Sequence, residues 1–415
     1  MVASTYSGRN ALDHATRVVL VGAAIYVAAR FSQRGALVNL GFWLPVAGLV
    51  AVLAAGGARE VALLLRSRLA IAAAAYVAML GYGLLVAPDS HVAWRGFLPA
   101  HGRALVSALF VAYAASRPEH ARWLLISLVV GALLACTKQA GEHFMHWQAT
   151  GRLSPEYQLI RTNAPAHAFY LPAIVAMALL ATGWRRALVL AFVVALETVF
   201  LLLAAARGSW LSVASGGLVA ATLTRHWKLV AALGAAGVAA LAVLALAIPD
   251  SQVAWRFQQG FSTSGRVTGT WGPALDLIRE RPIAGYGYGQ AAFHEAFDAA
   301  VPRHPDWTER ASLGPHNIYL AAWFAGGPLF LLSMLWLFAE MALVFLRVFR
   351  QTGDPDVRSL ALAGLSSLVS AYLVQGFFED TLWLAFGILL GLALGLERAL
   401  ARTPRCAPAA LAARP

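Results

Sequence analysis

The chain has 415 residues, of which 60% are hydrophobic and only 13% are charged, and its mean hydropathy is +0.66. Soluble domains carry about 25% charged residues, so this composition excludes a soluble globular protein and indicates an integral membrane protein. The net charge of +12 comes almost entirely from arginine. In a membrane protein, such an excess is typical of cytoplasmic loops and does not indicate nucleic-acid binding. Two cysteines, Cys136 and Cys406, predict neither a disulfide framework nor a zinc site.

Twelve apolar runs are long enough to form membrane-spanning helices, for which about 20 residues are needed. They lie near residues 15–30, 36–57, 69–87, 98–116, 123–141, 167–183, 187–205, 209–224, 227–248, 328–347, 358–376 and 381–400. The first run is expected to be a retained span, since no cleavable signal pattern precedes it. The least certain division is the one between the seventh and eighth runs, which meet at Arg207 and Gly208. The expected fold is therefore an all-α membrane protein of about twelve helices.

The placement of basic residues predicts the orientation, because cytoplasmic loops are rich in arginine and lysine. Alternate loops and the tail carry Arg59, Arg66, Arg68, Arg117, Arg122, Arg185, Arg186, Arg225, Lys228, Arg347, Arg350, Arg358, Arg398, Arg402 and Arg405. The short loops on the other side carry only Arg34 and Arg95. Both termini are therefore expected in the cytoplasm.

This topology divides the chain into four parts. Residues 1–248 hold spans 1 to 9, residues 249–327 form one large periplasmic loop, residues 328–400 hold spans 10 to 12, and residues 401–415 form a cytoplasmic tail. The large loop is expected to be helical in part, because Trp271, Ala274, Leu275 and Ile278 recur at helical spacing within the stretch 267–279.

Arginines on the outer side are candidates for binding an anion, because the cytoplasmic excess does not explain them. Arg207 stands between two apolar runs, and Arg266 follows Ser262 to Ser264, which can cap a helix start that binds anions. Arg161 precedes the sixth span, and Arg279 ends the amphipathic stretch. For each of them the alternative is an arginine that reaches to water or to lipid headgroups.

The stretch 284–293 reads AGYGYGQAAF and contains Tyr286 and Tyr288. No strand precedes it, as a dinucleotide site would require, so a flexible aromatic turn over a lipid or a sugar is expected instead. His143 and His146 lie three residues apart beside Glu142 but lack the spacing and the third ligand of a metal site. No phosphate-binding loop or serine-nucleophile motif is present. The sequence therefore predicts no metal and no cofactor.

His316 stands in the stretch SLGPHNIYL, just before an apolar run. Pro315 favours a break, and a helix is expected from Asn317 onward, with His316 in its first turn. The positive end of the helix dipole disfavours a protonated imidazole there, and a neutral imidazole is what a general base requires. The alternative is a histidine packed at the membrane interface.

Taken together, these residues resemble the O-antigen ligase and polymerase superfamily. The resemblance rests on Arg-Gly-x-Trp at 207–210, Ser-Gly-Arg at 264–266, Trp271, Pro-x-x-Gly-x-Gly at 282–287 and His-Asn-x-Tyr-Leu at 316–320. These motifs cover roughly residues 205–330, and the number of spans extends the similarity over most of the chain. One departure is Thr-Asn-Ala-Pro at 162–165, where related ligases often carry a glycine turn, and this puts the role of Arg161 in doubt.

The resemblance implies a membrane glycosyltransferase of the GT-C type in the bacterial inner membrane, with its active site facing the periplasm. It would move a glycan from undecaprenyl pyrophosphate to an acceptor hydroxyl, which for a ligase belongs to a lipid A–core sugar and completes lipopolysaccharide. Arginine forks bind phosphate oxygens and stay charged, so Arg207 and Arg266 would hold the donor while His316 takes the acceptor proton, with inversion and without metal. Further expected substrate contacts are Arg161, Arg279, Tyr286, Tyr288, Asn317 and Tyr319, and the pair Glu379 and Asp380 could orient His316.

Three alternatives remain open at this stage. An O-antigen polymerase and a protein oligosaccharyltransferase would use the same donor with another acceptor. A polytopic lipid or sugar transporter would instead place charges near the membrane midplane. The glycan structure, the acceptor hydroxyl and the oligomeric state are not encoded in these motifs.

Overall fold

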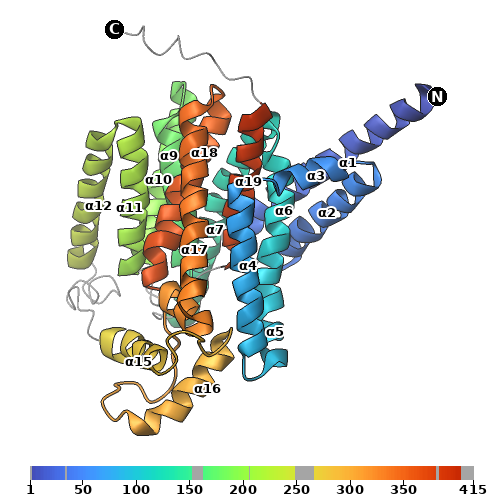
Figure 1. The fold of residues 1–415 in the computed structure, drawn as a ribbon. Coiled ribbons are helices and arrows are strands. Elements are labelled where there is room, and N and C mark those ends of the chain that lie inside the picture. The colour runs from blue at the N-terminus through green and yellow to red at the C-terminus, as the bar shows by residue number, and fades with distance from the viewer. Residues whose placement is uncertain are drawn as a thin grey trace.

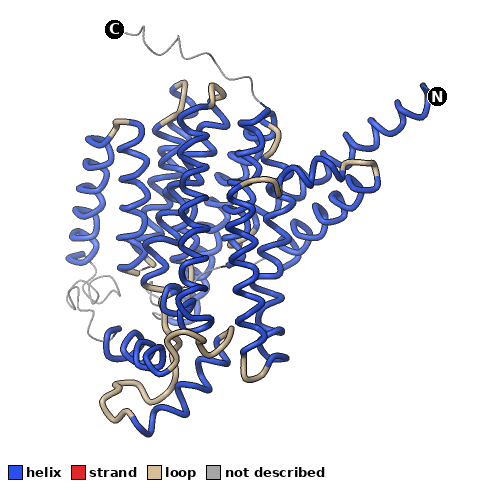
Figure 2. The backbone as a smooth tube through the Cα atoms, in the orientation of Figure 1, coloured by secondary structure: helices blue, strands red, loops and turns tan. Residues whose placement is uncertain are grey.

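The computed structural model describes residues 2–32, 35–151, 162–204, 206–247, 266–379 and 383–402. Within these ranges every regular element is a helix and no strand occurs (Figure 2). This confirms the predicted all-α class.

Each of the twelve predicted apolar runs falls on a helix. The helices are α1 (Val2–Ala29), α2 (Gly35–Ala54), α4 (Arg68–Val86), α6 (Arg103–Ala115), α7 (Ala121–Thr150), α9 (Ala164–Leu179), α10 (Trp184–Leu203), α11 (Arg207–Thr224), α12 (Trp227–Ala247), α17 (Ile318–Gln351), α18 (Pro355–Leu368) and α19 (Trp383–Arg402). By length and composition, eight helical stretches in the described part of the chain are apolar and long enough to cross a membrane. That all twelve helices cross it stays a prediction.

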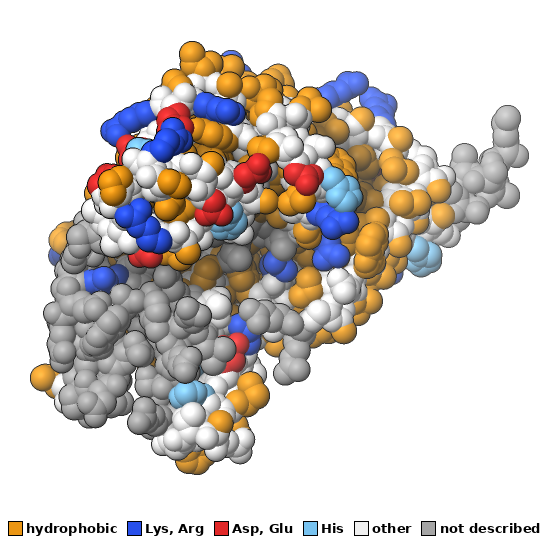
Figure 3. Space-filling view, turned by 90° about the horizontal axis from the view of Figure 1, so that it is seen from below, with side chains coloured by type: hydrophobic (Ala, Val, Ile, Leu, Met, Phe, Trp, Pro, Cys, Tyr) orange, Lys and Arg blue, Asp and Glu red, His pale blue; other side chains and the backbone are white. Residues whose placement is uncertain are grey.

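The two chain ends lie at the same end of the helix bundle, and the loop helices α15 (Gly272–Glu280) and α16 (Gln290–Ala300) lie at the opposite end (Figure 1). A shared end for the termini agrees with an even number of crossings. The loop end carries charged side chains of both signs on its described surface (Figure 3).

Small residues let α19 pack closely along α6. Gly387, Gly391 and Gly395 recur every four residues, and a Cβ on any of them would overlap the α6 backbone or its side chains. Such small-residue seams allow van der Waals contact between membrane helices, which supplies much of their association energy. These three glycines therefore hold α19 in close contact with α6 along most of the length of α6.

The long helix α17 is broken at Gly326 and Gly327, which have non-helical backbone angles. Gly327 has φ +69°, and a Cβ there would overlap the carbonyl oxygen of Ile283. Helical structure begins at Ile318, next to the start expected at Asn317, and the span predicted at 328–347 begins after the break. Pro328 then opens the second segment, where its fixed φ and missing N–H are tolerated.

The glycine- and tyrosine-rich stretch packs against the membrane helices. Tyr286 N–H and Gly287 N–H donate to the carbonyls of Phe324 and Ala325, and Tyr288 N–H donates to the carbonyl of Gly83. Positive φ values at Gly285, Gly287 and Gly289 permit these close approaches. The backbone of this turn is therefore held against α4 and α17, and the contact of its aromatic side chains with a lipid or a sugar stays a prediction.

The amphipathic helix of the loop was predicted with one error. Ala274, Leu277 and Ile278 are buried, whereas Leu275 is 37% exposed. The buried face of α15, which the π-helix η3 (Val267–Trp271) precedes, runs through positions 274, 277 and 278, so Leu277 lies on it and Leu275 does not. The predicted stop holds, since α15 ends at Glu280.

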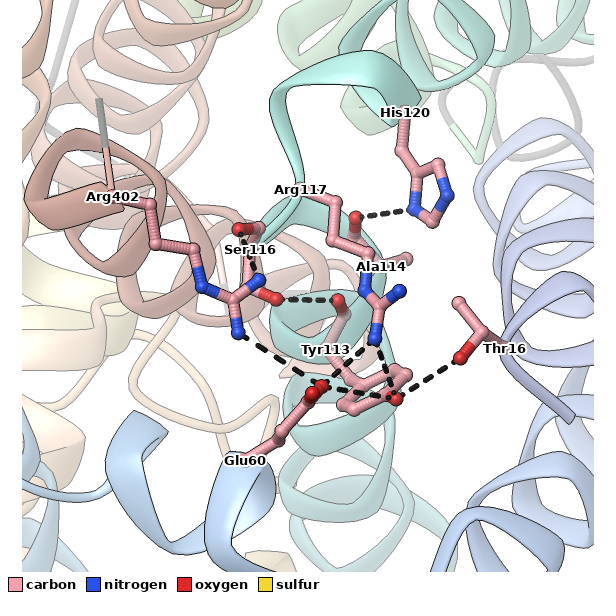
Figure 4. Close-up of polar contacts among 8 residues, drawn as sticks. All are labelled: Thr16, Glu60, Tyr113, Ala114, Ser116, Arg117, His120 and Arg402. Carbon is pink, nitrogen blue, oxygen red and sulfur yellow. Dashed lines mark hydrogen bonds and ion pairs between the residues drawn. The ribbon is translucent and has the colours of Figure 1, made fainter. Parts of the chain in front are cut away.

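A polar cluster joins four helices (Figure 4). Glu60 on α3 (Ala58–Leu64) accepts a hydrogen bond from Arg117 at 2.8 Å and lies 3.8 Å from Arg402. Arg117 also donates to the Tyr113 hydroxyl, which lies 3.1 Å from the Thr16 hydroxyl. The cluster ties α1, α3, α6 and α19 together at the end away from the loop helices.

Candidate functional site

His316 stands at a sharp corner of the chain. Gly314 has φ +82° and His316 has φ +44°, so the backbone is left-handed at both positions. Asn317 follows as the N-cap of α17, and its side-chain oxygen accepts from Tyr319 N–H at 2.9 Å and Leu320 N–H at 3.1 Å. His316 therefore precedes the helix, and its predicted place in the first turn was wrong. A non-glycine residue with positive φ carries strain that is typical of functional sites.

Glu379 joins His316 to Arg266. One carboxylate oxygen lies 3.6 Å from His316 Nδ1, and the other lies 3.5 Å from an Arg266 guanidinium nitrogen. The side chains of His316, Arg266 and Glu379 are 31%, 29% and 22% exposed, so all three are reachable from outside. The other half of the predicted orienting pair, Asp380, lies outside the described residues.

Arg266 is held by the turn of chain that contains Phe378 and Glu379. It donates a hydrogen bond to the carbonyl of Phe378, and its guanidinium lies 5.6 Å from the centre of the Phe378 ring. This fixes one edge of the guanidinium while leaving the group partly exposed.

Arg207 opens α11 against the same turn. A Cβ on the next residue, Gly208, would meet the Phe378 ring at 2.9–3.2 Å, and Ser212 donates to Gln375 at 2.9 Å. Among the described residues, the buried Nη1 of Arg207 has no hydrogen-bond partner. Buried polar atoms in proteins are normally bonded, so this nitrogen is suited to an anion.

Two residues of the His-Asn-x-Tyr-Leu motif have structural contacts. Asn317 caps α17, and Tyr319 donates from its hydroxyl to the carbonyl of Leu373 at 2.8 Å. The Tyr319 ring lies 4.4 Å from that of Phe377. These contacts hold the start of α17 against the turn that carries Glu379, so the predicted substrate contacts of both residues are better described as support for the site.

Replacing the cap gives a direct test of that description. Asn317→Ala should lower the free energy of unfolding by about 1 kcal/mol, the usual effect of losing an N-cap side chain, whereas Asn317→Asp should retain it. Thermal unfolding in detergent, measured with the KM for the donor, checks this. Unchanged stability with a raised KM in Asn317→Ala would instead mean that Asn317 contacts substrate.

The remaining predicted contacts lie apart from this corner. Tyr286 stacks on Phe324 with ring centres 4.8 Å apart and donates to Glu280 at 3.1 Å. Burial and that hydrogen bond raise the pKa of Tyr286, so its hydroxyl stays protonated. Arg279 has a 75% exposed side chain and pairs with Asp276 at 2.7 Å, as expected of a solvated helix end.

Arg161 lies outside the described residues, so its predicted contact stays untested. The groups of three possible metal ligands within the described ranges are Cys136, His167 and Glu197, and Asp276, His304 and Asp306. Neither group contains His143 or His146.

A cavity of about 580 Å³ lies beside the corner, and Pro315 and Ile318, which flank His316 and Asn317, line it. Its lining is mainly apolar, with His101 and Tyr288 inside and Arg95 among its polar groups. His101 Nδ1 lies 2.7 Å from the Tyr288 hydroxyl. Sequence reasoning missed this cavity, because its walls come from α4, α5 (Ser90–Phe97), η1 (Leu98–Gly102), the loop, α17 and α19.

The corner thus places a partly exposed imidazole and the Arg266 guanidinium beside the two oxygens of one carboxylate, and residues that flank the imidazole line an apolar cavity. This arrangement can hold an anion and accept a proton from a group brought through the cavity. A carboxylate near an imidazole stabilises its protonated form, so Glu379 suits a histidine that gains a proton during a reaction.

Comparisons with known proteins agree with the sequence motifs. A protein-family model described as O-antigen ligase matches residues 187–335, which include Arg207, Arg266 and His316. An O-antigen ligase of Salmonella typhimurium (strain LT2) is 33% identical over 227 residues, which cover 51% of this chain and 54% of that protein. The match thus spans about half the length of the relative, and both comparisons show that this chain is similar to O-antigen ligases.

Proposed function

From its similarity to O-antigen ligases, we propose that the chain transfers a preassembled glycan from undecaprenyl pyrophosphate to a hydroxyl of a lipid A–core sugar at the periplasmic face of the inner membrane. The observation that carries the proposal is the carboxylate of Glu379, which lies within 3.6 Å of His316 and 3.5 Å of Arg266. A proton acceptor and a phosphate-binding cation therefore meet at one point.

The donor's pyrophosphate is assigned to Arg207 and Arg266. A pyrophosphate leaving group carries at least two negative charges, and arginine binds phosphate oxygens through several N–H donors while remaining charged. The buried Nη1 of Arg207 offers one such donor. As the bond between the sugar and the pyrophosphate breaks, both cations stabilise the charge that develops on the leaving oxygen.

His316 is assigned to the acceptor. Its imidazole takes the proton of the acceptor hydroxyl while that oxygen forms a bond to the anomeric carbon, and the electron pair of the broken bond leaves with undecaprenyl pyrophosphate. A single displacement of this kind inverts the anomeric centre. Glu379 stabilises the imidazolium that forms, in the way that a carboxylate supports a catalytic histidine. Since the two arginines neutralise the leaving group, the scheme needs no metal ion.

The cavity is assigned to the acceptor. It lies beside Pro315 and Ile318, which flank His316 and Asn317. An amphiphilic acceptor placed there would bring its sugar hydroxyl close to His316.

Reconstitution tests the reaction itself. Purified enzyme with undecaprenyl-pyrophosphate glycan and lipid A–core should yield a glycan ladder on lipid A–core when the products are separated on a gel, with or without a chelator. Extension of the lipid-linked glycan alone would mean a polymerase. Loss of the ladder on adding the chelator would overturn the metal-free scheme.

A further inference from the structure

A cluster of four fully buried polar side chains lies within the helix bundle. Gln139, His167 and Glu197 are 0% exposed and Cys136 is 2% exposed. They come from α7, α9 and α10. Buried polar and ionisable groups within membrane helices are costly and are candidates for a functional role.

The hydrogen bonds of the cluster form one connected chain. His167 lies between Glu197, 2.6 Å from Nδ1, and Gln139, 2.7 Å from Nε2. The Cys136 thiol donates to Glu197 at 3.3 Å, and the Gln139 amide donates to the carbonyl of Phe200 at 3.0 Å.

The direction of these bonds follows from their ends. A backbone carbonyl only accepts, so the amide nitrogen of Gln139 faces Phe200 and its oxygen faces His167. His167 must therefore carry a proton on Nε2, and one further proton lies between Nδ1 and Glu197. Each of the four side chains thus has a hydrogen-bond partner, and this network of hydrogen bonds favours one geometry of the cluster.

The cluster fixes the last turn of α10, which leads directly to Arg207. Gln139 bonds to Phe200, and the Trp210 indole on the first turn of α11 donates to the carbonyl of Leu201 at 3.0 Å. Ala204 and Ala206 pack with Ala164 at the start of α9. The start of α11, with Arg207 as its first residue, is thus connected through Leu201 and Phe200 to the buried cluster.

We propose that Gln139, His167 and Glu197 are positioning residues that hold Arg207 in place to bind the donor pyrophosphate. This inference rests on the proposed function, since it assumes that Arg207 contacts the pyrophosphate. A charged group must be held within a fraction of an ångström of its productive position to act on a transition state, and supporting hydrogen bonds supply that precision. The Arg-Gly-x-Trp segment then works as a unit, because Trp210 attaches Arg207 to the end of α10.

The test uses Glu197→Gln in the full-length protein, because this change keeps the side-chain volume while altering the bond to His167. The matched control is Glu60→Gln, which disturbs a comparable carboxylate cluster at the opposite end of the bundle (Figure 4). The affinity for undecaprenyl pyrophosphate, the KM for the lipid-linked glycan and thermal unfolding are measured for both. We expect about tenfold weaker donor binding in Glu197→Gln and unchanged binding in Glu60→Gln. Equal loss of stability in both variants with unchanged donor affinity would overturn the proposal.

A double-mutant cycle separates positioning from a general structural role. If Glu197 acts through Arg207, Glu197→Gln should not weaken donor binding further in an Arg207→Ala background, because residues that act through one another are non-additive. Additive losses would overturn the proposal. Arg207→Ala alone also tests the proposed function: unchanged donor affinity in that variant would refute the phosphate role of Arg207, whereas reduced affinity in Arg207→Ala with normal affinity in Glu197→Gln would refute only the positioning role.

Cysteine reactivity supplies a local readout. Cys136 is buried in the cluster and Cys406 is the only other cysteine, so in a Cys406→Ser background a maleimide reports on Cys136 alone. The thiol should be unreactive in the parent and in Glu60→Gln but labelled in Glu197→Gln at temperatures well below unfolding. Labelling equal to the parent in Glu197→Gln would show that the cluster does not hold this region in place.

Discussion

His316→Ala should abolish transfer of the glycan to lipid A–core while leaving the affinity for undecaprenyl pyrophosphate unchanged. The variant loses the proton acceptor but keeps both arginines, and loss of a general base typically lowers kcat by about 10²- to 10⁴-fold. Single-turnover transfer and donor binding, measured on the same preparation, check the two halves of this expectation.

His294→Ala is the matched control. His294 lies on α16 in the same loop and outside the corner formed by Gly314 to Asn317. Its removal should leave kcat within about twofold, because a substitution away from the site usually has a small effect. A fully active His316→Ala enzyme would refute the assignment of the base. A parallel loss in both variants would point to a general effect on the loop.

Arg266→Ala should weaken donor binding about 10- to 100-fold, because a hydrogen bond to a charged group contributes about 1.5–3 kcal/mol. Arg266→Lys should recover only part of the affinity, since an ammonium group keeps the charge but lacks the planar fork that binds phosphate oxygens. Titration with undecaprenyl pyrophosphate at two salt concentrations measures both effects.

Arg279→Ala provides the comparison for this series. Arg279 is also an arginine of the periplasmic loop, but its side chain is 75% exposed and paired with Asp276. Its removal should leave donor affinity unchanged. Equal weakening in Arg266→Ala and Arg279→Ala would mean that the loop attracts the donor through its overall charge and not through a defined site.

The sequence predicted the helices well, because membrane spans are encoded by local hydropathy. It was less successful for single residues. Leu275 was assigned to the buried face of α15 but is 37% exposed, and the positive φ of His316 placed that residue outside α17. The left-handed backbone at His316 does not follow from the spacing of apolar residues, which assumes a constant helical period.

The motifs located Arg207, Arg266 and His316, but not what supports them. The cavity and the buried cluster depend on side chains that meet only after several helices have packed. Gln139 and Glu197, for example, are separated by 58 residues in sequence and joined only through His167. One local signal was present, since Glu197 is an acidic residue within the apolar run AFVVALETVFLLL, and such residues are rare in membrane helices without a role.

The break in α17 has a consequence for how such enzymes can diversify. The short segment from Ile318 to Ala325 is bonded to the loop through Tyr286 and Gly287, whereas Arg207 belongs to the helix bundle. Substitutions in the loop can therefore change the orientation of the His316 imidazole so that it contacts a different acceptor hydroxyl. The position of Arg207, which is assigned to the phosphates, would stay the same. A lineage could in this way change the sugar it modifies while keeping the same carrier lipid.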